Sequence, residues 1–201
     1  MTAQAVNLPI QGTMAGFRRF SVAEYHKLID IGILTEDDNL ELLEGYLVHK
    51  MPHNPPHDGT IDLFSEALRR HLPASWILRI QQAITLGDSE PEPDGAVVRG
   101  NARTYLARHP GPADVGVVIE VANTTLDADR IDKCRIYARA GIVCYCIINV
   151  KDQQIEVYTA PSGPTASPGY GQRADYRVGD QVPLVLDGAT AAVIAAQDLL
   201  P

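Results

Sequence analysis

Two stretches of the chain are almost continuously apolar. Residues 95–98 and 115–121 are rich in β-branched side chains, and polar residues bound both of them. Runs of this length and composition are typical of strands that are buried on both faces of a sheet. The pattern therefore predicts a buried central sheet, and a single acid, Glu120, interrupts its second run.

Apolar residues recur with helical periodicity in two segments, which we expect to form helices over residues 21–32 and 58–72. The possible cap residues Asn123, Thr124 and Thr125 predict a third helix over residues 126–140. The first segment begins with a capping-box pattern, because Glu24 follows Ser21 at a distance of three residues. Pro73 ends the second segment, and Gly141 closes the third.

Shorter apolar segments predict the remaining strands, which we expect over residues 40–43, 46–48, 76–86, 142–150 and 153–159. The first two of these surround a tight turn at residues 44–45. Residues 103–109 are expected to be partly helical, and the alanine-rich residues 189–196 fit either a strand or a helix.

The order of these elements predicts an α/β fold with a mixed central β-sheet flanked by helices. With 201 residues, 45% of them hydrophobic, the chain is long enough to form one domain with a full-sized core. We expect this domain to span residues 17–201 and to follow a flexible arm over residues 1–16. The N-terminus has no signal-peptide pattern and no apolar run is long enough to span a bilayer, so we expect a cytoplasmic protein.

The net charge of −8 limits how the protein could bind nucleic acid. Proteins that bind nucleic acid by charge alone are usually basic, so the overall charge argues against an avid DNA-binding protein. It does not exclude a nuclease, because bound divalent cations reverse the sign of the local field in an acidic cleft.

Three charged residues are candidates for catalysis. Asp94 precedes the first apolar run, Glu120 lies in the second, and Lys133 lies on the predicted helix that follows. A carboxylate in an apolar strand is costly unless a cation compensates it. Two acids and a lysine that converge at a sheet edge suffice for metal-assisted phosphodiester hydrolysis.

Each candidate also has a purely structural interpretation. Asp94 fits a strand-entry residue that accepts hydrogen bonds from loop N–H groups. Lys133 fits the solvated face of a helix. Glu41 is a third candidate acid, but an exposed glutamate on an edge strand explains it equally well.

Histidines and cysteines form two further patterns. His49, His53 and His57 recur every four residues, which on a helix would create a metal-binding face. Prolines in the same segment are expected to make residues 49–57 a loop, so zinc ligation is not predicted, although His57 could still line the site. Cys144 and Cys146 are expected to face opposite sides of a strand as ordinary reduced core residues.

Several motifs in this order resemble the bacterial putative restriction endonuclease family, which belongs to the PD-(D/E)XK nuclease superfamily. The resemblance covers about residues 20–201. It rests on Phe20, Ser21, Glu24 and Tyr25, residues 40–45, Met51, Pro52, His57, Gln81, residues 91–94 and 118–121, Lys133, and residues 137–142.

The resemblance implies a restriction-endonuclease-like fold with Mg²⁺ as the usual metal, held by Asp94 and Glu120. It carries the catalytic roles over to these two acids, to Glu41 and to Lys133. In the usual motif the lysine would stand two residues after the glutamate, where this chain has Ala122. Homodimers are common in such relatives.

The leading hypothesis is a Mg²⁺-dependent endonuclease that hydrolyses DNA phosphodiester bonds with a metal-activated water, with Mn²⁺ as a substitute ion. The alternative is a non-catalytic module that keeps the fold and binds nucleic acid or a partner. The joint presence of Asp94, Glu120 and Lys133 favours the enzyme, because a binding module does not need them together.

Overall fold

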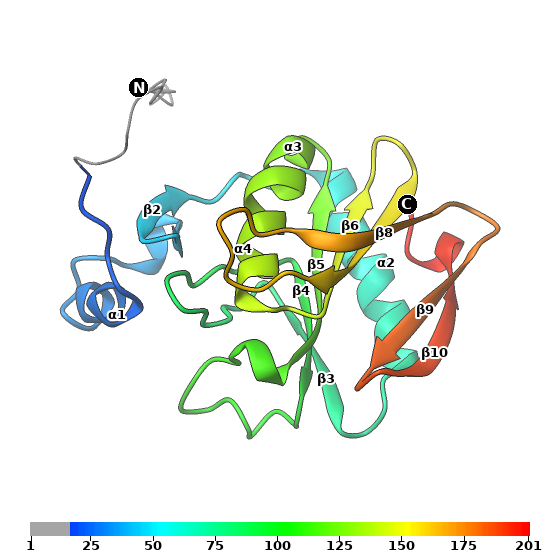
Figure 1. Ribbon diagram of the computed structural model, residues 1–201, viewed down its shortest axis with the longest axis horizontal. Helices are drawn as coiled ribbons and strands as arrows, with labels where there is room; N and C mark the ends of the chain where they lie inside the picture. The colour runs from blue at the N-terminus through cyan, green and yellow to red at the C-terminus, as the bar shows by residue number, and fades with distance from the viewer. Residues whose placement is uncertain (1–16) are drawn as a thin grey trace.

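A six-stranded mixed sheet lies at the centre of the fold (Figure 1). The computed structural model describes residues 17–201, so the arm predicted for residues 1–16 lies outside the described residues. The strands, in their order across the sheet, are β3 (Trp76–Ile80), β4 (Gly95–Arg99), β5 (Val115–Ala122), β6 (Cys144–Asn149), β7 (Gln154–Pro161) and β8 (Tyr170–Tyr176). Only β5 and β6 pair in parallel within this sheet, and a helical connection joins them.

Helices and two hairpins surround the sheet. The helices are α1 (Val22–Asp30), α2 (Pro55–His71), α3 (Leu126–Ala128) and α4 (Cys134–Ala140), with a π-helical segment, Asp129–Lys133, between the last two. The hairpins are β1 (Leu40–Leu43) with β2 (Tyr46–His49), and β9 (Gln181–Leu186) with β10 (Ala189–Ala195). Short 3-10 turns occur at Glu36–Asp38, Pro112–Asp114 and Ala196–Asp198. Among residues 17–201, none of the helices has the length and apolar character needed to cross a membrane.

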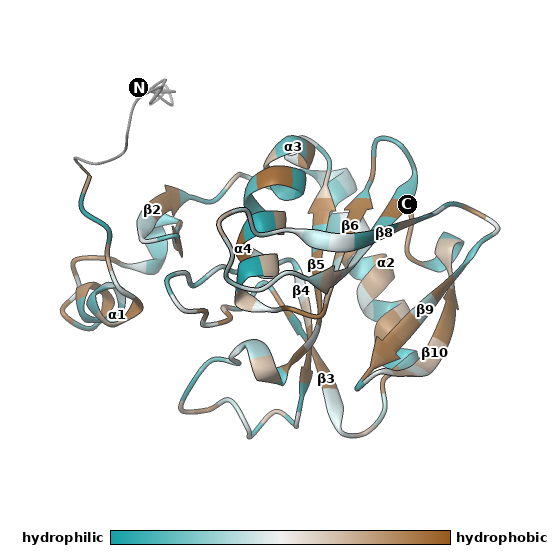
Figure 2. Cartoon of the chain, in the orientation of Figure 1, coloured by the Kyte–Doolittle hydropathy of each residue, from teal (hydrophilic) through white to brown (hydrophobic). Residues whose placement is uncertain are grey.

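Each face of the sheet has its own hydrophobic core. One core joins α2 and the β9–β10 hairpin to one face, and Val117 and Ile119 of β5 point into it. The other core joins α4 to the opposite face, and Val118 points into it. This alternation follows from the period of two along a strand. Figure 2 shows the apolar positions gathered on the central strands, which contribute to both cores, and on β9, which contributes to the first.

The β1–β2 hairpin lies beside α1 at one end of the molecule (Figure 1). The backbone N–H of Phe20 donates to the carbonyl of Gly45, and the hydroxyl of Tyr25 donates to the carbonyl of Leu40. An isolated bridge between Leu42 and Glu90 joins the hairpin to the chain segment that leads into β4. The hairpin therefore stands next to the entrance of a central strand.

The structure confirms the predicted α/β class with a mixed sheet. The capping box of α1 is present, because the Ser21 hydroxyl accepts from the Glu24 N–H and the Glu24 carboxylate accepts from the Ser21 N–H. The alanine-rich segment that fitted either structure forms strand β10.

Some predicted boundaries are wrong. Residues 103–109 form turns rather than a helix, because Tyr105 is buried and its hydroxyl donates back to the Arg99 carbonyl. The strand predicted over residues 76–86 ends at Ile80, because Gln81 has a left-handed backbone with a φ of 49°. The helix predicted over residues 126–140 contains the π-helical segment, in which the Cys134 N–H reaches the Asp129 carbonyl.

Two further predictions are wrong for simple geometric reasons. Pro55 and Pro56 begin α2 instead of excluding a helix, because the first helical positions need no N–H donor. Cys144 and Cys146 face the same side of β6, since residues two apart in a strand share a face. Their sulfur atoms lie 3.9 Å apart.

Candidate functional site

One cleft brings together the four residues that the sequence singled out. Glu41, Asp94, Glu120 and Lys133 all line it, and its volume is about 230 Å³. Its walls come from the β1–β2 hairpin, the loop before α2 and the first turn of that helix, the segment that leads into β4, the C-terminal part of β5, and the π-helical segment. The segment before β4, strand β5 and the π-helical segment thus contribute Asp94, Glu120 and Lys133 to the same cleft.

The register of the sheet places Asp94 next to Glu120. Gly95 pairs with Ile119 in the antiparallel β4–β5 ladder, so Asp94 and Glu120 are the next facing positions. Facing residues of an antiparallel pair share one side of the sheet. In both strands this is the side that packs against α4, as the position of Val118 in that core shows. The two acids therefore reach the cleft from neighbouring strands.

Asp94 is only 7% exposed, and the backbone satisfies part of its charge. Its Oδ2 accepts from the Val121 N–H at 2.8 Å and lies 3.2 Å from Nε2 of His57. Burial opposes ionisation of Asp94, but the hydrogen bond and charge of His57 outweigh burial and lower the pKa of Asp94. Asp94 is therefore ionised at neutral pH.

Glu120 has a different electrostatic environment. It is 4% exposed, and its Oε1 accepts from the Tyr137 hydroxyl at 2.7 Å and from Lys133 Nζ at 2.9 Å. Burial raises the pKa of Glu120 to about 8, against the charge of Lys133 and with further repulsion from Asp94 and Asp129. An additional cation in the cleft would favour the ionised form of Glu120.

Lys133 supplies the ammonium group that pairs with Glu120. Its Nζ also lies 3.6 Å from Oε1 of Glu41. Burial disfavours the charged form of Lys133, but Glu120 and Glu41 outweigh burial and raise its pKa. The ammonium group is therefore charged at neutral pH and already shared between two carboxylates. The interpretation of Lys133 as part of a solvated helix face is wrong.

Glu41 is buried rather than exposed on an edge strand, with 5% of its surface accessible. Its Oε2 accepts from the Glu92 N–H at 3.1 Å. The bridge between Leu42 and Glu90 brings this backbone N–H within reach. The structural alternative that the sequence left open for Glu41 is therefore wrong.

Sequence reasoning missed two groups that contact this cluster. Asp129 is buried in the cleft wall and its carboxylate accepts from the Thr125 hydroxyl at 2.6 Å, while burial raises its pKa. Tyr137 is fully buried and holds Glu120 through its hydroxyl. Asp129 stands one helical turn before Lys133, and this spacing could have placed Asp129 beside Lys133 from the sequence alone. Tyr137 stands among apolar residues, so no sequence pattern indicated its contact with Glu120.

The donor set of the cleft fits a hard divalent cation. Asp94 Oδ1 and Glu120 Oε2 accept no hydrogen bond from any part of the chain that the structure describes, whereas the second oxygen of each residue does. Carboxylate oxygens are the ligands that Mg²⁺ and Mn²⁺ prefer. Six carboxylates and two lysines line the cleft, so its charge also favours a cation.

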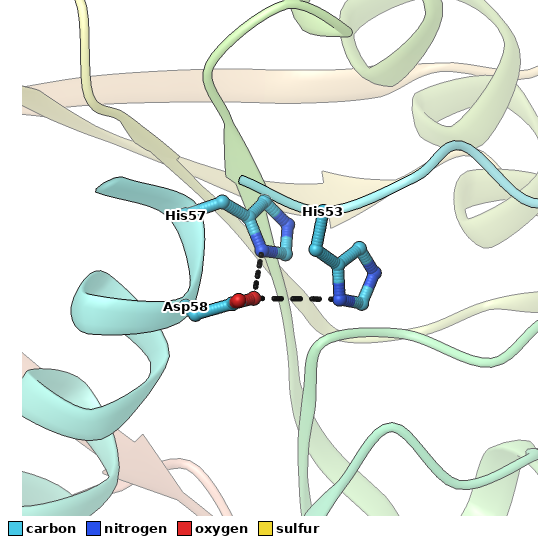
Figure 3. A group of neighbouring side chains, drawn as sticks. All are labelled: His53, His57 and Asp58. Carbon is cyan, nitrogen blue, oxygen red and sulfur yellow. Dashed lines mark ion pairs between the residues drawn. The ribbon is translucent and has the colours of Figure 1, made fainter. Parts of the chain in front are cut away.

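A second group of metal-ligating side chains lies beside the carboxylates (Figure 3). His53, His57 and Asp58 each direct one ligand atom to a common point, and these atoms lie within 4.8 Å of one another. The predicted loop over residues 49–57 extends only to Asn54, because Asn54 caps α2 and the helix starts at Pro55. His53 therefore approaches His57 from the segment before the helix rather than from a shared helical face. His49, the third histidine of the pattern, is not part of this group.

Comparisons with known proteins agree with this architecture. Residues 22–192 match the family model described as Uma2, putative restriction endonuclease. A crystal structure of a putative nuclease belonging to DUF820 from Anabaena variabilis ATCC 29413 has the same fold, with a TM-score of 0.63 and 17% sequence identity. That match covers 86% of this chain and 96% of the other chain. None of the curated proteins matches this chain. Because the family model spans most of its length, the chain belongs to the Uma2 family of putative restriction endonucleases.

Proposed function

We propose that the protein is a Mg²⁺-dependent endonuclease that hydrolyses DNA phosphodiester bonds with a metal-activated water. The observation that carries this proposal is the pair of buried carboxylates, Asp94 and Glu120, which face each other from neighbouring strands beside Lys133. Each carboxylate has one oxygen without a hydrogen bond from the described residues, so both can bind the same ion.

The proposed division of labour follows from the contacts of each residue. Asp94 and Glu120 would hold the ion, which would polarise the phosphate and lower the pKa of the attacking water. His57 and the Val121 N–H orient Asp94, and Tyr137 orients Glu120. Lys133 would stabilise the negative charge that develops on the phosphate, and Glu41 keeps the ammonium group in place.

Charge distinguishes this proposal from simple DNA binding. The chain carries a net charge of −8, and acids outnumber lysines in the cleft wall. A phosphodiester would be repelled from such a cleft in the absence of divalent ions. We therefore expect productive binding of DNA only with the metal present, with Mn²⁺ as a substitute for Mg²⁺. We also propose that the active form is a homodimer.

A plasmid-nicking assay with a Mg²⁺ titration tests the proposal. The wild-type protein should nick DNA only with a divalent ion, and Asp94→Asn should lose both metal binding by calorimetry and cleavage. Asp62→Asn is the matched control, because Asp62 is an exposed aspartate on α2 outside the cleft. A wild-type protein that binds no divalent ion would favour the non-catalytic module. Equal nicking by Asp94→Asn and wild type would refute the assigned site.

A further inference from the structure

Two histidines and an aspartate converge at the start of α2, next to the proposed magnesium site (Figure 3). The Nδ1 atoms of His53 and His57 each lie 3.5 Å from Oδ1 of Asp58. The two imidazole rings stack with their centroids 4.4 Å apart. Three potential ligand atoms therefore face one small volume.

These separations fit a shared metal better than direct hydrogen bonds. Two ligands of a tetrahedral zinc ion with bonds of about 2.0–2.1 Å are roughly 3.3–3.4 Å apart. An N–H···O hydrogen bond spans about 2.7–3.2 Å, so 3.5 Å is long for one. His57 Nδ1 is buried and has no hydrogen-bond partner. A buried nitrogen without a partner is costly, and a metal ion would satisfy it.

Hydrogen bonds to the side chain of Asn54 hold this group in place without a metal. The Asn54 side chain accepts from the His57 N–H at 3.2 Å and from the Asn123 side chain at 2.9 Å. These bonds tie the start of α2 to the loop that follows β5. His57 and Asp58 therefore belong to a capped first turn, and His53 immediately precedes its cap.

From this geometry we propose that His53, His57 and Asp58 form a second metal site, specific for a borderline ion such as Zn²⁺. Two imidazole nitrogens and one carboxylate are a donor set typical of zinc and related transition metals. The all-oxygen pair of Asp94 and Glu120 suits Mg²⁺ instead. Three protein ligands leave a coordination position free for water or for a phosphate oxygen.

His57 connects the two sites. Its Nε2 lies 3.2 Å from Asp94 Oδ2, while its Nδ1 faces Asp58. A metal-bound histidine usually donates its other N–H to a carboxylate, which selects the tautomer and orients the ring. Asp94 performs this positioning role through Oδ2 and retains Oδ1 for its own cation. Both sites can therefore be filled at the same time.

His53 has one competing contact, to the side chain of Gln81. Gln81 Nε2 lies 3.1 Å from His53 Nδ1. An amide nitrogen only donates hydrogen bonds, so this contact places the lone pair of the imidazole on Nδ1. A metal ion would replace a single bond to an exposed glutamine, and the amide can return to water.

Zinc binding to the full-length, chelator-treated protein tests the proposal without any DNA. Isothermal titration with Zn²⁺, in the presence of excess Mg²⁺, should show one site in the wild type. Co²⁺ should give visible absorption bands typical of a nitrogen- and oxygen-ligated ion. His53→Ala and Asp58→Asn should each weaken Zn²⁺ binding by at least about tenfold, because even the loss of an outer-shell partner has an effect of that size.

His49→Ala is the matched control, since this histidine lies in the same segment and outside the group. It should bind Zn²⁺ like the wild type. The proposal is overturned if the wild type binds no Zn²⁺, or if His53→Ala and Asp58→Asn bind it unchanged. Loss of Zn²⁺ in Glu120→Gln but not in His53→Ala would assign the ion to the carboxylate pair and also overturn it. Because no cleavage is measured, failure here leaves the nuclease proposal to its own test.

Discussion

Replacing Glu120 with glutamine removes the acid whose ionisation the fold opposes most clearly. Glutamine keeps the shape of the side chain and can still accept the hydrogen bond of Tyr137, but it cannot ionise. Burial raises the pKa of Glu120 from 4.5 to about 8 in the metal-free protein, against the attraction of Lys133. Glu120→Gln therefore imitates the protonated state of the wild type at every pH.

The sign of the effect follows from proton linkage. A carboxyl group with a higher pKa in the folded state binds more protons when folded, so stability falls as the pH rises from about 4.5 through about 8. At about 1.4 kcal/mol for each pH unit between these values, the full loss is on the order of 5 kcal/mol at alkaline pH. Glu120→Gln should escape this loss and become more stable than the wild type there.

Urea unfolding from about pH 5 to about pH 9, with chelator and then with Mg²⁺, measures the difference between the two proteins. Mg²⁺ at 100 times its dissociation constant should increase the free energy of unfolding of the wild type by about 2.7 kcal/mol and leave that of the variant unchanged. Glu156→Gln is a control for which the pH dependence of stability should have the opposite sign. Despite burial, Arg130 lowers the pKa of Glu156, so Glu156 contributes stability that is lost as the pH falls. A pH-independent difference between wild type and Glu120→Gln in chelator would refute the reasoning.

Three further outcomes are expected. Lys133→Ala should keep its Mg²⁺ affinity by calorimetry but lower the nicking rate by about 10²–10³-fold, because the ammonium acts on the transition state rather than on the metal; loss of metal binding would contradict the assigned role. Tyr137→Phe should cost about 1 kcal/mol in urea unfolding. In the wild type the hydrogen bond from Tyr137 lowers the pKa of Glu120, so its loss should move the Glu120 transition to higher pH. An unmoved transition would contradict this. Light scattering should report a dimer at micromolar concentrations, and a monomer throughout would contradict the proposed assembly.

The central part of the cleft could be predicted because its residues interrupt strong local patterns. Glu120 stands out in a run of β-branched residues, and Asp94 stands at the entry of the neighbouring apolar run. Once two strands pair with a fixed register, their side-chain directions follow from the period of two. The convergence of these two acids therefore depends on little more than strand pairing.

Other parts of the site depend on tertiary contacts that no local pattern reports. Tyr137 looks like a core aromatic of an amphipathic helix, and its hydroxyl finds Glu120 only after α4 packs on the sheet. Glu41 looks like an exposed edge residue until the chain after Gln81 covers it. Propensity and periodicity describe one segment at a time, so they cannot supply such partners.

The histidine group shows a different kind of error. The prolines in residues 49–57 predict a loop, but the position of a proline within a helix decides its effect. In the first turn a proline lacks only an N–H that would have had no partner, so Pro55 and Pro56 start α2. The cap residue Asn54 was the signal that could have revealed this start, and with it the approach of His53 to His57.

Charge balance links the fold of the cleft to its proposed chemistry. The ammonium group of Lys133 is already shared between Glu120 and Glu41, so it leaves little net attraction for a phosphodiester. Asp94 and Asp129 add negative charge within the same buried region. The metal-free cleft is therefore electrostatically strained, and part of that strain appears as the raised pKa of Glu120. A divalent ion would relieve this repulsion and create the positive potential that a phosphate requires. Under the proposed function, the same excess of carboxylates that opposes folding without metal would make the binding of a phosphodiester substrate depend on the ion.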